Sequence, residues 1–245
     1  MVKPRILRMK DSSDDYVIKK EGLDSVPFRL AISGKSGVGK TNIIGSLLLL
    51  KENYGGIYKG KNVWVFSPMK NDVKMMKIIE MLDVPQDNLF ENYNDEILNN
   101  IYDDIVDKFE ERVNSKKQPE PTLIILDDIT FDGSIAKKFS AVNRCFMNLR
   151  KHFGSILVCT QKWSQISTGQ RANASSILFF NSNIKEKTLF ETDANYLKST
   201  KMFFKMLDDN LKSKRDFIYV DFSQELVKDM YKDKNFDTID ISKYE

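Results

Sequence analysis

One run of eight residues has the composition of a turn that binds a polyphosphate. It matches the pattern G-x-x-x-x-G-K-[ST] in full and consists of Gly34, Lys35, Ser36, Gly37, Val38, Gly39, Lys40 and Thr41. Glycines allow the backbone to curl until successive N–H groups point at phosphate oxygens. The Lys40 ammonium can then reach the β- and γ-phosphates, and the Thr41 hydroxyl is a hard oxygen ligand for Mg²⁺. We therefore predict that these eight residues bind ATP with Mg²⁺; the alternative is a glycine-rich turn with an accidental lysine.

Two adjacent carboxylates follow the most apolar segment of the chain, residues 122–126. Parallel strands present their terminal side chains at the carboxyl edge of the sheet, so Asp127 and Asp128 are expected beside the phosphates. We predict that Asp127 is the second protein ligand of Mg²⁺ and that Asp128 is the base that polarises the attacking water. Alternatively, the pair only ends a strand, or Asp128 caps the next element.

Further candidates come from a glutamine and from the arginines. Gln161 follows the apolar segment 155–160 and could contact the γ-phosphate or the water, although an ordinary loop glutamine would look the same. Phosphoryl transfer gains greatly from an added guanidinium, which a neighbouring subunit often supplies. Arg150 and Arg171 are our main candidates for that role, with Arg144 as a third, and each could instead be a solvated surface charge.

Strands and helices alternate along the chain, and the strands are almost entirely apolar. This pattern predicts an α/β fold of the P-loop NTPase type, with a mostly parallel sheet covered by helices on both faces. The expected strands are 28–33, 62–67, 122–126, 155–160, 176–180 and 217–221. The expected helices are 40–53, 72–82, 95–113, 136–151, 185–196, 200–211 and 224–231. Residues 1–26 are interpreted as an N-terminal arm, 27–222 as the P-loop ATPase domain, and 223–245 as a C-terminal helix with a charged, mobile tail.

Composition restricts the partners only weakly. The 38 basic and 35 acidic residues leave a formal net charge of +3, so any DNA contact would have to be a local patch. Candidates for such a patch are Lys35, Lys162, Lys185, Lys187, Lys212, Lys214 and Arg215. The two cysteines do not form a metal motif and favour a reduced, intracellular protein, and we expect neither a signal peptide nor a membrane span.

Several short segments resemble the poxvirus-type genome-packaging ATPases of the FtsK–HerA division, which occur in large DNA viruses and virophages. They are Pro27-Phe28-Arg29, Val65-Phe66-Ser67-Pro68, Leu126-Asp127-Asp128, Arg150-Lys151-His152, Thr160-Gln161-Lys162 and Arg171-Ala172-Asn173. The resemblance covers residues 26–183. It implies a RecA/FtsK-like core, a homohexameric ring that moves double-stranded DNA into a capsid at its portal vertex, and Arg150 as a candidate arginine finger. It also implies a location in the viral factory of the host cytoplasm, and in the virion.

Two other functions are compatible with the same motifs. A RecA-like helicase or recombinase-type ATPase would share the core but act on single strands. A nucleotide-gated assembly or regulatory protein would bind ATP as a switch and hydrolyse it slowly. Stimulation of hydrolysis by duplex DNA, without unwinding, would favour the packaging function over both.

Overall fold

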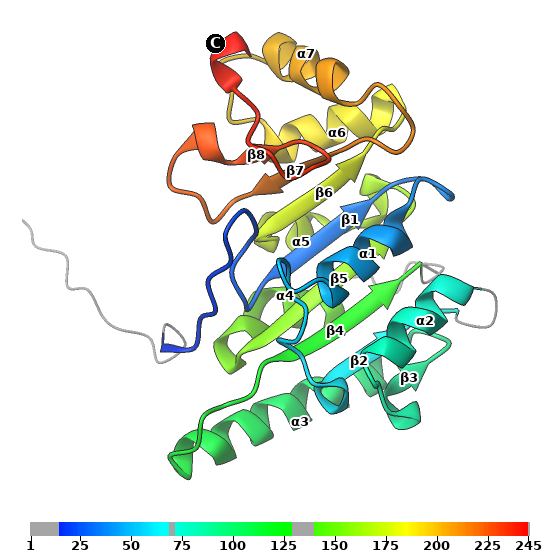
Figure 1. Ribbon diagram of the computed structural model, residues 1–245, viewed down its shortest axis with the longest axis vertical. Helices are drawn as coiled ribbons and strands as arrows, with labels where there is room; N and C mark the ends of the chain where they lie inside the picture. The colour runs from blue at the N-terminus through cyan, green and yellow to red at the C-terminus, as the bar shows by residue number, and fades with distance from the viewer. Residues whose placement is uncertain (1–14, 69–71, 129–139, 245) are drawn as a thin grey trace, which may run out of the picture.

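The computed structural model describes residues 15–68, 72–128 and 140–244. Eight strands form one sheet in the order β3-β2-β4-β5-β1-β6-β7-β8 (Figure 1). The first six strands of that order are parallel, and β7 and β8 are antiparallel to their neighbours. The strands span Arg29–Ser33 (β1), Val63–Phe66 (β2), Leu89–Phe90 (β3), Thr122–Asp127 (β4), Gly154–Thr160 (β5), Ser176–Phe180 (β6), Phe217–Asp221 (β7) and Tyr231–Lys232 (β8).

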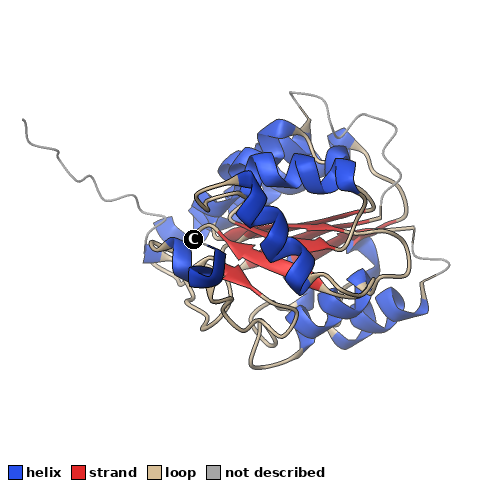
Figure 2. Cartoon of the chain, turned by 90° about the horizontal axis from the view of Figure 1, so that it is seen from above, coloured by secondary structure: helices blue, strands red, loops and turns tan. Residues whose placement is uncertain are grey.

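Helices cover both faces of this sheet (Figure 2). The helices are α1 (Lys40–Leu49), α2 (Val73–Met81), α3 (Asp95–Asn114), α4 (Ala141–Asn148), α5 (Thr168–Asn173), α6 (Ile184–Ala194) and α7 (Thr200–Asn210). One apolar core contains side chains of α1 and α2, and the other contains side chains of α3, α4, α6 and α7. The predicted α/β fold with a mostly parallel, doubly covered sheet is therefore confirmed.

Strand β1 illustrates why the strand sequences lack polar positions. Successive side chains of a strand point to opposite faces. Leu30 and Ile32 pack in the core with α1, whereas Ala31 between them packs in the core on the other face. All three are fully or almost fully buried, and burial of a side chain the size of Leu30 or Ile32 contributes about 1.5–3 kcal/mol to folding. Two buried faces thus require an uninterrupted apolar run.

The strand order brings the predicted chemistry to one edge. Strand β5 lies between β1 and β4, and Ser33 pairs in register with Thr160 while Asp127 pairs with Cys159. The strands are parallel, so the turn after β1, the carboxylates after β4 and Gln161 after β5 all emerge at their carboxyl ends. The fold therefore supplies the convergence that the sequence pattern required.

The end of the chain differs from expectation. The predicted helix 224–231 is wrong, because the structure has a single 3-10 turn at Val227–Asp229 followed by β8, which pairs with β7. The predicted mobile tail is also wrong for its described part, in which Ile239, Ile241 and Tyr244 are buried. Short-range patterns missed this because the apolar residues are isolated among charged ones and become a core only by packing against distant elements.

Smaller differences concern helix ends and the first residues. Helix α1 ends at Leu49 rather than at residue 53, and residues predicted as a loop form α5. Part of the predicted helix 136–151 lies outside the described residues, and its described part is α4 and a 3-10 turn. In the described part of the N-terminal arm, Leu23, Asp24 and Val26 are buried against the domain. No helix in the described part of the chain is long and apolar enough to cross a bilayer.

Candidate active site

The glycine-rich turn connects β1 to α1 and has the curled backbone that the pattern requires. Gly37 and Gly39 have φ angles of 76° and 113°, which are unfavourable for residues with a side chain. Gly39 is the N-cap of α1, and its carbonyl accepts the Ile43 N–H. Gly34 is required for space instead, because a Cβ there would lie 2.8 Å from the Cβ of Phe180 on β6.

Lys40 is folded over this turn from the first position of α1. Its ammonium donates to the carbonyls of Gly34 at 2.8 Å and Lys35 at 3.2 Å, and only 7% of the residue is exposed. These bonds hold the ammonium beside the turn, where its charge adds to the positive N-terminal end of the helix. A phosphate oxygen arriving at the turn would therefore meet a cation that is already positioned.

Asp72 is a member of the site that sequence reasoning missed. Its Oδ2 accepts the Thr41 hydroxyl at 3.1 Å, and its Oδ1 caps α2 by accepting the N–H groups of Lys74 and Met75. The sequence predicted only that a helix begins at Asp72, which gave no reason to place its carboxylate at a phosphate site. The fold adds the second role by placing the start of α2 against the start of α1.

Asp127 lies at the buried end of β4, with 4% of its surface exposed. Burial raises its pKa to about 6, and the negative charges of Asp128 and Asp72 act in the same direction. The Ser67 hydroxyl donates to its Oδ2 over a long 3.4 Å. A cation bound next to a carboxylate in this environment would strongly stabilise its ionised form.

Asp128 and Gln161 form a direct pair. The Gln161 amide donates to both carboxylate oxygens of Asp128, at 3.0 and 3.2 Å. Asp128 has a φ of 44°, and its N–H donates to the Cys159 carbonyl at 3.2 Å. The backbone after β4 thus turns sharply and presents this carboxylate toward the end of β5. The two residues that were chosen separately from the sequence are in contact.

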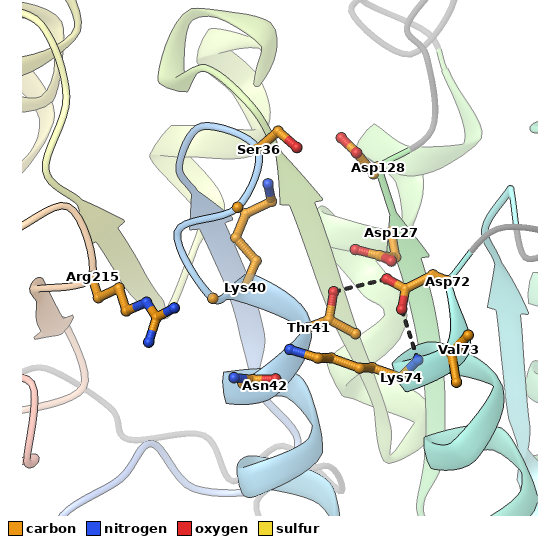
Figure 3. Close-up of a pocket in the computed structure, with 12 residues that line it drawn as sticks. Ser36, Lys40, Thr41, Asn42, Asp72, Val73, Lys74, Asp127, Asp128 and Arg215 are labelled. Carbon is orange, nitrogen blue, oxygen red and sulfur yellow. Dashed lines mark hydrogen bonds between the residues drawn. The ribbon is translucent and has the colours of Figure 1, made fainter.

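A single cavity of about 480 Å³ joins these groups (Figure 3). It is lined by Ser36, Gly37, Gly39, Lys40, Thr41, Asn42, Asp72, Val73, Lys74, Asp127, Asp128 and Arg215. Arg215 comes from the loop between α7 and β7 and was considered only as a DNA contact in the sequence. It approaches the start of α1 from the side opposite Asp127 and Asp128 (Figure 3).

The oxygen atoms of this cavity suit magnesium. The Thr41 hydroxyl and the Asp127 carboxylate are hard ligands, the type that Mg²⁺ prefers. Across the described ranges of the chain, no three His, Cys, Asp or Glu side chains are grouped as a protein-only metal site would require. Magnesium in phosphate sites takes one or two protein oxygens and completes its shell with water and phosphate. Thr41 and Asp127 would hold the ion.

The two main arginine candidates from the sequence have different surroundings. Arg150 is exposed in the 3-10 turn Leu149–His152, before the amino end of β5 and therefore at the edge of the sheet opposite its own phosphate turn. Arg171 pairs with Asp193 at 2.9 Å and donates to the Ile166 carbonyl at 2.8 Å, and its side chain is only 10% exposed. Neither lines the cavity of its own subunit. Arg150 is the freer of the two to reach a neighbour.

The fold and the site define a P-loop NTPase. Strand β1, the phosphate turn and α1 supply the nucleotide cradle, and a neighbouring buried strand supplies the paired carboxylates. A family model described as "Poxvirus A32 protein" matches residues 16–230, so the chain belongs to that family.

Solved structures of a viral packaging enzyme have the same fold. The genome-packaging NTPase B204 of Sulfolobus turreted icosahedral virus 2, in complex with AMP, superposes with a TM-score of 0.57 at 12% identity, covering 84% of this chain and 96% of B204. Its ATP-gammaS complex gives a TM-score of 0.55 at 12% identity over 83% and 94% of the two chains. B204 of Sulfolobus Turreted Icosahedral Virus, described as a DNA-packaging ATPase, gives 0.54 at 13% identity over 85% and 97%. No curated protein matches the sequence.

Proposed function

We propose that this protein is an ATPase that uses hydrolysis to move double-stranded viral DNA into a capsid. The main observation in support is that one cavity is lined by Lys40, Thr41, Asp127 and Asp128. Gln161 is hydrogen-bonded to Asp128. Membership of the A32 family and the likeness to B204, a genome-packaging NTPase in two viruses, support DNA packaging as the use of that chemistry.

Each residue has a defined task in this proposal. The backbone N–H groups of the turn and Lys40 bind the phosphates, and Thr41 and Asp127 hold Mg²⁺. When bound, the ion neutralises charge on the β- and γ-phosphates. Asp128 orients and polarises the attacking water, and Gln161 fixes the orientation of Asp128 through its two hydrogen bonds. Because Gln161 ends the strand next to β1, it can also transmit the state of the γ-phosphate to the rest of the domain.

A guanidinium from a second subunit completes the proposed site. Arg150 is exposed and remote from its own cavity, so it would act on the nucleotide of a neighbour in a closed ring, a hexamer by the family resemblance. Arg171 is the weaker candidate, because a trans role would require it to break its ion pair with Asp193. Head-to-tail interfaces of this kind generate rings when the rotation closes. The proposed partners are therefore double-stranded DNA, further copies of this chain and the capsid or its portal vertex, in the host cytoplasm where virions assemble.

The central test is ATP hydrolysis by purified protein with duplex DNA, with single-stranded DNA and without DNA. We expect Mg²⁺-dependent hydrolysis that duplex DNA stimulates, with no strand displacement. Lys40→Ala should abolish turnover, whereas Lys51→Ala, an exposed lysine outside the cavity, should not. Full activity of Lys40→Ala would contradict the site. Stimulation by single strands with unwinding would favour a helicase, and slow hydrolysis indifferent to DNA would favour a nucleotide-gated assembly protein.

A further inference from the structure

Arg215 is a basic group of the cavity for which the proposed mechanism has no role. It is exposed, it lines the cavity, and its guanidinium has no ion-pair partner among the described residues. Figure 3 shows the side chain extending toward the start of α1, on the side away from Asp127 and Asp128. A cation in this position is available to a ligand, because no carboxylate in the described part of the chain neutralises it.

The turn that carries Arg215 is held firmly on both sides. The Ser213 N–H donates to the Asp216 carboxylate at 2.7 Å, and the Asp216 N–H donates back to the Ser213 carbonyl at 3.2 Å. Lys234 pairs with the same carboxylate at 2.9 Å, and the Asn181 N–H bonds the Asp216 carbonyl at 3.2 Å. These contacts tie the turn to β6 and to the C-terminal segment. Arg215 is therefore presented from a fixed backbone, which lowers the entropic cost of using it in binding.

The location of Arg215 indicates which part of a nucleotide it would contact. In a phosphate turn of this type the lysine reaches the β- and γ-phosphates, and the threonine hydroxyl faces the metal. Asp72 accepts a hydrogen bond from Thr41, and Asp127 lies on the same side of Thr41, so the γ-phosphate end of the cavity is on their side. Arg215 is on the other side of the turn. The phosphate on that side is the one joined to the ribose.

We propose that Arg215 binds the α-phosphate of the nucleotide held by its own subunit. A guanidinium recognises phosphate oxygens through charge-assisted, often bidentate hydrogen bonds. The α-phosphate is present in ATP, ADP and AMP and is not altered by hydrolysis. Arg215 therefore contributes to the affinity for all three nucleotides. The inference rests on the proposed nucleotide site and replaces a DNA-channel role for this residue.

The experiment measures dissociation constants for a non-hydrolysable ATP analogue, ADP and AMP, together with duplex DNA affinity. Arg215→Ala should weaken the binding of all three nucleotides by a similar factor of about ten or more, with DNA affinity retained. Arg215→Lys should recover part of the loss, since it keeps the charge without the fork. Lys214→Ala is the matched control on the same turn: Lys214 is exposed, does not line the cavity, and should behave as wild type.

Three results would overturn the inference. A loss confined to the ATP analogue would place Arg215 at the γ-phosphate, and unchanged nucleotide affinity would remove it from the site. A loss of DNA affinity with normal nucleotide binding would show that Arg215 contacts DNA. Each of these results requires that the wild type binds nucleotide and that Lys40→Ala does not. If the wild type bound no nucleotide, the proposed function itself would fail. Circular dichroism of the variants, all at exposed positions except Lys40, verifies that they are folded.

Discussion

Asp24→Asn should stabilise the protein at neutral and alkaline pH. Asp24 belongs to the N-terminal segment that packs on the domain, and only 3% of it is exposed. Its N–H donates to the Tyr219 hydroxyl at 2.9 Å, and its carbonyl accepts the Tyr54 hydroxyl at 2.8 Å, so the backbone is fixed while the carboxylate Oδ2 has no partner. Burial, with a smaller contribution from the charge of Asp221, raises its pKa from 3.8 to about 7.

The sign and the size follow from proton linkage. Between pH 4 and pH 7 the folded protein holds a proton on Asp24 that the unfolded chain has lost, so the free energy of unfolding falls as pH rises through this window. The difference between 3.8 and 7 is 3.2 pKa units. At 1.36 kcal/mol per unit this corresponds to an upper limit of about 4 kcal/mol at pH 8. Asparagine keeps the shape and removes the charge, so the gain should approach this limit at pH 8 and vanish near pH 4.

Urea unfolding followed by tryptophan fluorescence at pH 4.5, 6 and 8 measures this effect. The curves for wild type and Asp24→Asn should diverge as the pH rises. Asp107→Asn, which removes an exposed carboxylate from α3, should follow the wild type at every pH. If the free energies of unfolding of Asp24→Asn and wild type changed in parallel with pH, the pKa of Asp24 would not be raised in the folded protein, and the reasoning would be refuted.

Three further predictions concern the active site. Gly34→Ala should lower the free energy of unfolding by about 1–3 kcal/mol and weaken nucleotide binding, because its Cβ would contact Phe180 at 2.8 Å; thermal unfolding and nucleotide titration check this. Asp72→Ala should lower the free energy of unfolding by about 1 kcal/mol through loss of the helix cap, whereas Asp72→Asn should keep the cap. Both variants should require more Mg²⁺ for hydrolysis. An unchanged Mg²⁺ titration would exclude Asp72 from the metal site. Arg150→Ala should lower kcat by about 10³-fold at unchanged nucleotide affinity. When this variant is mixed with wild type, the ATPase activity should fall more steeply than the wild-type content. Activity that falls only in proportion to wild-type content would argue against a residue acting in trans.

Helix α2 and the residue after α1 carry exposed apolar side chains. Val73, Met76 and Met81 on α2 are 83%, 46% and 59% exposed, and Leu50 after α1 is 45% exposed. Asp72 caps α2 and also bonds Thr41, so the position of this helix is linked to the group that would bind the metal.

The sequence by itself determined the parts of the site whose chemistry is local. The phosphate turn needs consecutive backbone N–H groups and glycines, so its whole function is contained in eight adjacent residues. The buried strands were predictable because two covered faces demand continuous apolar runs, and Asp127 and Asp128 were predictable because they directly follow such a run. Most helices were found from their periodicity, with errors at their ends.

Only the tertiary structure decided which distant residues join that turn. In the sequence, Asp72 was only the first residue of a predicted helix, and Arg215 was one of several candidates for a DNA contact. The packing of α2 and of the α7–β7 loop placed them at the cavity. The same holds for β8, which is a strand because β7 offers it a partner, and for Arg171, whose pairing with Asp193 depends on how α5 meets α6. Contacts between residues far apart in the chain leave no periodicity in either segment, and they are fixed only when the two cores on opposite faces of the sheet are packed.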